Sequence, residues 1–176
     1  MSRKLLNSEL PRLSPEAFKQ ARKLPLVLVL DNIRSQHNIG AAFRTADAFL
    51  IEKIYLCGIS SPPPSAEIHK AALGAEDTVA WHYEKDTMQA VAGLREKGYT
   101  LVAIEQVEGS VPLHDFQPRK NKKYALIFGN EVKGVQQQIV DECPILLEIP
   151  QQGTKHSLNV SVSIGIVLWN IVSKIQ

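Results

Sequence analysis

Residues 155–169 read "KHSLNVSVSIGIVLW", and this most apolar stretch of the chain fits two kinds of secondary structure. Its first half places apolar residues at every second position, which is the pattern of a half-buried strand. On a helix, Ser157, Ser161 and Gly165 instead form a stripe of small residues beside a broad apolar face. The strand-like "ILLEIP" before it is too close for a parallel crossover, although an antiparallel hairpin would fit. We therefore predict a helix buried on most sides, whose small-residue stripe admits another backbone.

The composition is that of an ordinary globular domain. The chain has 176 residues, of which 44% are hydrophobic and 22% charged, enough for one domain with a full core. No apolar run reaches the roughly 20 residues of a transmembrane helix, and the N-terminus lacks the apolar core of a signal peptide. Cys57 and Cys143 lie in apolar surroundings without metal-ligand spacing, so we expect buried free thiols. These features predict a cytoplasmic protein without a membrane partner.

The net charge of +2 is unevenly distributed along the chain. Residues 1–23 carry six Lys or Arg against two Glu, whereas the remainder has a small acidic excess. A second basic cluster, "RKNKK", occupies residues 119–123. Basic patches dock phosphates, but short clusters are more often solvated surface. We divide the chain into a basic N-terminal extension with a short helix, residues 1–23, and one domain, residues 24–176.

Segments typical of strands and helices alternate along the chain. "SPEAF" at 14–18 is a helix start with Ser14 as N-cap, and "LPLVLVLD" at 24–31 is typical of a strand covered on both faces. Asn38 opens the helical stretch "NIGAAFRTADAFL". Further strands are expected at "KIYLCG", "TVAWHY", "YTLVAIEQ", "YALIFGNE" and "ILLEIP", and further helices at "AEIHKAAL", "DTMQAVAGLREKG" and "VQQQIVDE". This alternation predicts an α/β fold, with a mostly parallel sheet and helices on both faces.

Three polar loops follow predicted strands, where ligands bind in open parallel sheets. They read "DNIRSQHNIGAAFR", "FGNEVKG" and "PQQGTKHSLN". They contain neither G-x-G-x-x-G nor a Walker lysine motif, which disfavours a Rossmann-type nucleotide enzyme. A hydrolase is disfavoured as well, because the adjacent His156 and Ser157 cannot form a nucleophile–base pair and no G-x-S-x-G elbow is present. The histidines are scattered without ligand spacing, so we expect no metal site.

Taken singly, most polar residues of these loops have ordinary structural interpretations. Asn38 fits a helix N-cap, Gly129 a turn, and Asn159 a residue that bonds free backbone groups. Glu131 fits an exposed acid in the first turn of a helix, where the helix dipole favours it. Arg44 is different, because its small and apolar neighbours predict a buried helix, and a buried arginine needs a partner.

Together the three loops resemble the signature motifs of the SpoU (TrmH-type) RNA methyltransferases, within the SPOUT superfamily. The matching segments are "NIGAAFRTADAF", "LIFGNEVKGV" and "IPQQGTKHSLNVSVS", in the family's order, and the resemblance spans roughly residues 25–172. The wording "IPQQG" and "IEQ" is most similar to the eukaryotic-type tRNA guanosine ribose methyltransferases. Two departures stand out: "RSQHN" replaces an Asp-Pro pair of many relatives, and "IPQQG" replaces the commoner "IPM".

The resemblance implies a fold and an activity. The implied fold is a SPOUT-type α/β knot, in which the last helix and its preceding loop form a deep C-terminal trefoil knot. The implied enzyme is a homodimer that uses S-adenosylmethionine (SAM) to methylate a ribose 2′-hydroxyl of RNA, and the wording above favours tRNA. The alternatives are the same reaction on rRNA, or a non-catalytic RNA-binding module on the same fold. Residues 1–23 are then expected to help grip the RNA.

The resemblance also assigns residues to the site. Arg44 matches the catalytic arginine and is expected to bind a phosphate and polarise the hydroxyl. Asn38 would help place the substrate nucleotide and Arg44, and Glu131 would be a hydrogen-bonding partner that orders the site. Ser157 and Asn159 would organise the SAM loop and the catalytic pocket. The residues expected to hold the cofactor, mainly through their backbone, are Phe128, Gly129, Asn130, Ile149, Gln151, Ser157 and Leu158.

Overall fold

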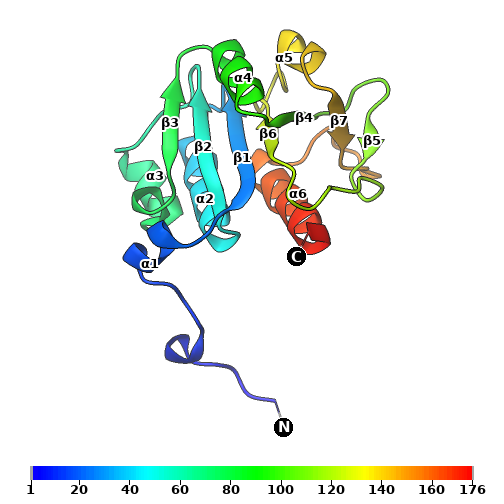
Figure 1. The fold of residues 1–176 in the computed structure, drawn as a ribbon. Helices are drawn as coiled ribbons and strands as arrows, with labels where there is room; N and C mark the ends of the chain where they lie inside the picture. Colours follow the sequence, from blue (N-terminus) through cyan, green and yellow to red (C-terminus); the bar gives the residue numbers. More distant parts are fainter. Residues whose placement is uncertain (1, 176) are drawn as a thin grey trace.

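A parallel sheet of seven strands forms the centre of the computed structural model, which describes residues 2–175 (Figure 1). The strand order is β3-β2-β1-β6-β4-β7-β5, and every neighbouring pair is parallel. The strands are β1 (Leu24–Asp31), β2 (Ile51–Cys57), β3 (Trp81–Glu84), β4 (Thr100–Ile104), β5 (Val111–Pro112), β6 (Tyr124–Phe128) and β7 (Ile145–Glu148). The expected α/β class is confirmed; the two-residue β5 is too short to leave a periodic signal in the sequence.

Helices cover both faces of this sheet. The helices are α1 (Pro15–Gln20), α2 (Gln36–Ala48), α3 (Ala66–Ala72), α4 (Thr87–Glu96), α5 (Gln137–Asp141) and α6 (Val160–Ile175). The core on one face contains buried residues of α2, α3 and α6, and the core on the other face contains those of α4 and α5. Cys57 and Cys143 are buried free thiols, as expected, and burial raises the pKa of each to about 12.

Strand β1 shows why its sequence is a continuous apolar run. Leu26, Leu28 and Leu30 point into the α2/α3/α6 core, whereas Val27 and Val29 point into the α4/α5 core. Because successive side chains of a strand alternate between faces, a strand with helices on both sides needs apolar residues at every position. The strand pairs with β2 on one side and with β6 on the other.

The segment at 155–169 is helical, as predicted, because α6 begins at Val160. Its buried face is made of large residues: Ile164, Val167, Leu168, Ile171 and Val172. We predicted that another backbone would lie close to the small-residue stripe, and for the backbone of the same chain this prediction is wrong. A Cβ added at Gly165 would meet nothing within 4 Å. The large aliphatic residues take the core side of α6, which leaves the stripe away from it. The knotted path of the chain stays a prediction.

The start of α2 also differs from the expectation. The N-cap is Ser35, whose Oγ accepts the Asn38 N–H at 3.3 Å, so the helix begins at Gln36. Asn38 therefore lies in the first turn, where its side chain does not cap its own helix.

The N-terminal extension is tied to the domain by α1. Residues 2–13 extend away from the body in Figure 1, whereas Phe18 is 5% exposed and packs into the core. The Lys23 Nζ lies 3.8 Å from the centroid of the Phe18 ring. Helix α1 therefore belongs to the packed part of the chain. Among residues 2–175, no helix has the length and apolar character needed to cross a membrane.

Replacing two helical glycines by alanine should have opposite effects on thermal stability. A Cβ at Gly40 would lie 2.5 Å from the Ile68 carbonyl oxygen, because α2 and α3 pack closely there, whereas a Cβ at Gly93 would meet nothing within 4 Å. Overpacking costs about 1–3 kcal/mol, more than the roughly 1 kcal/mol of helix propensity gained. We expect Gly40→Ala to lower Tm and Gly93→Ala to raise it by about 1–4 °C. Calorimetry that shows equal increases would contradict this packing.

Candidate functional site

The three loops singled out in the sequence meet at one edge of the sheet. They follow β1, β6 and β7, and β6 lies between β1 and β4, which pairs with β7. Since all strands are parallel, these loops leave from the same edge. Side chains from each loop are joined there in a chain of hydrogen bonds.

Glu131, from the loop after β6, anchors this chain of bonds. Its carboxylate accepts the backbone N–H groups of Arg34 (3.0 Å) and Ser35 (3.1 Å) and the Asn38 side-chain amide (3.1 Å). Burial alone would raise the pKa of Glu131, but these donors together hold it below its ordinary value. Glu131 is exposed, as that interpretation requires, but it lies in a turn outside any helix, so its placement in a helical first turn is wrong. The structure instead shows an ionised acceptor that fixes the start of α2.

Asn38 connects Glu131 to the third loop. It is 6% exposed, and while its amide nitrogen donates to Glu131, its Oδ1 accepts the Asn159 side-chain amide at 3.1 Å. The Asn159 Oδ1 accepts both the backbone N–H (2.9 Å) and the hydroxyl (2.6 Å) of Ser161 and so caps α6. The expected backbone role of Asn159 is therefore present together with its contact to Asn38. One buried amide thus ties the loop after β6 to the first turns of α2 and α6.

Two further carboxylates hold the loop after β6, and sequence reasoning missed both. Asp31 is fully buried and accepts the Gln136 N–H (3.0 Å), the Gln136 side-chain amide (2.7 Å) and the Thr87 hydroxyl (2.6 Å). Glu105, just after β4, accepts the Val135 N–H at 2.9 Å. Both acids end or follow a strand at the ligand-binding edge of the sheet. An acidic residue at the C-terminal end of a predicted strand is therefore the sequence signal that could have revealed both.

Gly129 is required because the loop folds back on itself. Asn130 and Gly134 exchange backbone hydrogen bonds of 3.0 and 2.8 Å. A Cβ at Gly129 would lie 2.0 Å from the Val135 nitrogen, and Gly134 has a φ of +69°. The loop is therefore a turn, as Gly129 indicated. A larger residue at position 129 would not leave room for it.

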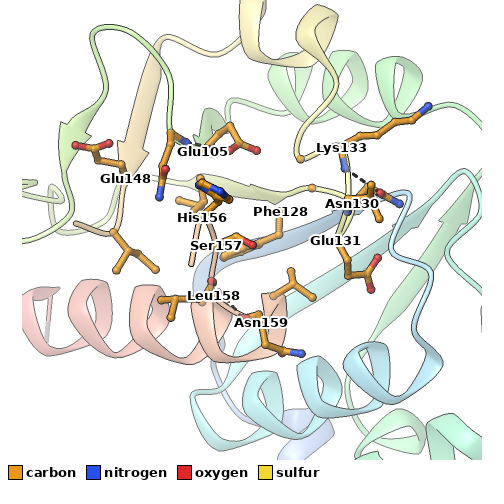
Figure 2. Close-up of a pocket in the computed structure, with 18 of the residues that line it drawn as sticks. Glu105, Phe128, Asn130, Glu131, Lys133, Glu148, His156, Ser157, Leu158 and Asn159 are labelled. Carbon is orange, nitrogen blue, oxygen red and sulfur yellow. Dashed lines mark hydrogen bonds between the residues drawn. The ribbon is translucent and has the colours of Figure 1, made fainter. Parts of the chain in front are cut away.

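A cavity of about 490 Å³ opens between these loops (Figure 2). Every residue expected to hold the cofactor lines it: Phe128, Gly129, Asn130, Ile149, Gln151, Ser157 and Leu158. Glu131 and Asn159 line it too, and Asn38 reaches it through its bonds to both. Figure 2 shows Glu148 and Glu131 on opposite sides of the cavity. With Glu105, three carboxylates and one lysine, Lys133, make the lining electronegative.

Arg44 does not line this cavity, and its predicted burial is wrong. Its side chain is exposed and makes no hydrogen bond or ion pair with any residue between 2 and 175. It lies six residues, or about 9 Å of helix rise, beyond Asn38. The small neighbours of Arg44 are explained by Gly40, which lets α3 approach α2 closely. Helix α2 is thus amphipathic, with Arg44 on its solvent-facing stripe.

The sequence model of the SpoU rRNA methylase family matches residues 25–169. The chain belongs to this family. It is 33% identical over 149 residues to the 23S rRNA (guanosine-2'-O-)-methyltransferase RlmB of Vibrio cholerae, and 34% identical over 144 residues to RlmB of Neisseria meningitidis. These matches cover 84% and 82% of the chain but only 59% and 56% of the two relatives. The chain therefore spans just over half the length of these SpoU relatives.

Solved structures of SpoU proteins share the fold. The TrmH/SpoU tRNA modifying enzyme of A. aeolicus has a TM-score of 0.79 and 25% identity, covering 91% of this chain and 81% of that protein. The AdoMet-bound rRNA methyltransferase of Sinorhizobium meliloti has a TM-score of 0.78 and 30% identity, covering 90% and 60%. The family resemblance drawn from the three motifs is confirmed.

The Glu131→Gln variant should be less stable than the parent chain, in a pH-dependent manner. Because the folded-state pKa of Glu131 is lowered, its ionised form stabilises the fold above the unfolded pKa of about 4.3, and this contribution is lost as pH falls through the folded value. An amide at position 131 accepts weaker hydrogen bonds than a carboxylate. Because the group is partly exposed, the free energy of unfolding should fall by about 1 kcal/mol, which lowers Tm by roughly 2–4 °C at pH 7.

The measurement is Tm for both chains from pH 7 down to pH 3. The difference should shrink below about pH 4. Glu108→Gln is the control, because that exposed side chain makes no hydrogen bond with residues 2–175. A Glu131→Gln difference that persists unchanged in acid would contradict the assignment.

Proposed function

We propose that the chain is a SAM-dependent RNA 2′-O-ribose methyltransferase. The observation that carries this proposal is the hydrogen-bonded chain Glu131–Asn38–Asn159, which joins three family motifs beside one cavity. The SpoU relatives named above methylate the guanosine 2′-O of 23S rRNA, according to their names. The chain retains all five residues that match catalytic motif positions, which weighs against a non-catalytic RNA-binding module: Asn38, Arg44, Glu131, Ser157 and Asn159.

The cavity of about 490 Å³ between the three loops, called the first cavity from here on, suits SAM in size and charge. Its volume lies within the ordinary range for cofactor sites, and Phe128, Ile149 and Leu158 give it apolar walls. SAM carries a sulfonium and an ammonium against one carboxylate, so its net charge is positive. The carboxylates of Glu105 and Glu148 would favour such a ligand over an anion. When bound, SAM supplies a methyl group activated by the sulfonium.

The chain's own residues would bring the RNA hydroxyl to that methyl group. A ribose 2′-hydroxyl is a poor nucleophile, so the site gains mainly by alignment and by assisting proton loss. The Glu131 carboxylate already accepts three N–H donors, and its lowered pKa makes it a weak base. We therefore assign Glu131 and Asn38 to positioning. They fix the start of α2 relative to Asn159.

Arg44 would act on the substrate through its charge. An arginine does not give up its proton at neutral pH, so Arg44 would bind the phosphate beside the target ribose and polarise the hydroxyl. The 2′-oxygen would accept the methyl group that bound SAM supplies, and the neighbouring phosphate would assist the transfer of the hydroxyl proton to solvent. An exposed guanidinium without a partner among residues 2–175 is free for this role.

Ribosomal RNA is the substrate that the relatives favour. Both curated relatives are named as 23S rRNA enzymes, so the preference for tRNA drawn from the sequence gains no support from them. The A. aeolicus enzyme, named as a tRNA modifying enzyme, keeps tRNA as the alternative. Incubation with labelled SAM and separate rRNA and tRNA pools, followed by mapping of methylated riboses, decides between them. A chain that labels neither pool would refute the proposed activity.

A homodimer that uses α6 is also part of this proposal. Val162, Ile166 and Trp169 form an exposed apolar stripe on α6, with Trp169 64% exposed. Exposed patches of large apolar residues of this kind mark interaction surfaces. Ser161 and Gly165 lie beside this stripe, where small residues permit close packing. Sedimentation of the purified chain tests this assembly, and a monomer at micromolar concentration would contradict it.

Arg44→Ala should abolish most of the methyl transfer while SAM binding survives. Loss of a charged group that acts in the transition state typically costs about 10²–10³ in kcat. Because Arg44 does not line the first cavity, the SAM affinity measured by calorimetry should stay within about twofold. Lys97→Ala, which removes one charge from the opposite edge of the sheet, is the matched control. Turnover of Arg44→Ala close to that of Lys97→Ala would exclude Arg44 from catalysis.

Deletion of residues 2–13 should weaken RNA binding without affecting the fold. A deletion to residue 22 would remove Phe18 from the core, whereas this shorter one keeps α1 and its N-cap Ser14. It removes Arg3, Lys4 and Arg12, so the RNA affinity should become less dependent on salt, by about 0.9 in log–log slope for each phosphate that the shortened chain leaves unneutralised. The readouts are RNA affinity at several salt concentrations and Tm. An unchanged affinity and slope would show that the extension does not hold RNA.

A further inference from the structure

A second cavity, of about 890 Å³, lies beside the first. Its floor and sides come from the loop after β1, from Ile59 after β2 and from the loop that leads from β6 into α5. Residues 130 and 132–134 line both cavities, so this short turn is their common wall. We call the second cavity the amide groove, because the carboxamides of Asn32, Asn130, Gln136, Gln137 and Gln138 line it. Its lining residues 130 and 132–135 belong to the second family motif, whereas Asn32, Arg34, Ile59 and Gln136–Gln138 lie outside the three matching segments.

The charge of the amide groove is opposite to that of the first cavity. Its charged lining residues are Arg34 and Lys133, and none of its described lining residues is acidic. The Arg34 guanidinium is exposed and makes no hydrogen bond or ion pair within residues 2–175. Two unpaired cations in a groove attract an anion, and a phosphodiester is the anion that the proposed reaction brings to this edge.

The groove also offers surfaces for a base. Ile59 and Val132 line it with side chains that are 60% and 76% exposed. Exposed apolar side chains of this kind can pack against the face of an unstacked base. Gln137 and Gln138 also line the groove. Their Nε2 groups donate to Asp141 Oδ1 (2.7 Å) and Gln136 Oε1 (3.4 Å), which leaves the amide oxygens and the second N–H of each for a base edge. A phosphate site, an apolar surface and paired donors and acceptors together match one nucleotide.

The walls of the groove are fixed before any ligand arrives. The Asn32 Oδ1 accepts the Ile59 N–H at 3.2 Å, and the Asn130 amide donates to the Asn32 carbonyl at 2.7 Å. Gln136 is held by Asp31 through its backbone N–H and its side chain. A preformed groove avoids the entropic cost of ordering its walls on binding.

We propose that the amide groove binds a nucleotide next to the methylated one, in a single-stranded segment of the substrate RNA. This inference rests on the proposed function, because the cavity across the shared wall is the one assigned to methyl transfer. Arg34 and Lys133 hold the phosphodiester, Ile59 and Val132 contact the base, and the amides of Gln137 and Gln138 read its edge. The groove thus selects for an unpaired segment at the target site.

The first test is Arg34→Glu against Lys97→Glu, an equal change of charge at the opposite edge. The Glu131 bond uses the Arg34 backbone N–H, so the first cavity should keep its SAM affinity. With the RNA pool that accepts label, we expect Arg34→Glu to raise KM at least tenfold, and Lys97→Glu less than threefold. Equal KM values for the two variants would overturn the proposal. Loss of SAM binding by Arg34→Glu would do so as well, because Arg34 would then serve the first cavity.

The second test locates the RNA directly on the wild-type chain. RNA that carries 4-thiouridine is cross-linked by light, and the modified peptides are identified by mass spectrometry. Cross-links to Ile59 or to residues 132–138 are expected, and cross-links confined to other surfaces would refute the groove. Failure of the proposed function appears separately, as a wild-type chain that binds RNA but transfers no label.

Discussion

The bridge that Asn38 makes between Glu131 and Asn159 is the constraint on which this edge of the sheet depends. Asn38 lies 93 positions from Glu131 and 121 positions from Asn159, so no local structure holds it beside either partner. The amide of Asn38 donates to one partner and accepts from the other, a task that a carboxylate at that position cannot perform. Because Glu131 also binds the backbone at Arg34 and Ser35, the start of α2 and the loop after β6 move as one unit.

The two cavities at this edge of the sheet differ in charge. Asp31, Glu105 and Glu131 each accept a backbone N–H from a loop that follows a strand, so carboxylates here replace part of the pairing that loops lack. Two of them also face the first cavity and make it electronegative, whereas the amide groove is lined by cations and amides. The same acids that shape the loops therefore separate a region suited to a cation from one suited to a polyanion.

The sequence predicted every strand except β5, the helical nature of α6 and the meeting of the three loops, because these follow from periodicity and parallel strand direction. It failed where side-chain direction matters. Arg44 looked buried, since small neighbours that serve the α2–α3 contact at Gly40 resemble those of a buried helix. Ser35, rather than Asn38, proved to be the N-cap, because both residue types suit that position. Asp31 escaped notice because its main partner, Gln136, lies 105 residues away.

The turn at residues 130–134 is the common wall of two cavities, and it is pinned at both ends by backbone bonds. Because a single stretch of backbone forms this wall, a displacement of the turn changes both cavities. A ligand that shifted this turn from one cavity would therefore change the affinity of the other cavity for its own ligand. Linkage makes this change equal in both directions. The affinities of two ligands bound on the two sides of this turn would therefore depend on each other through these five residues.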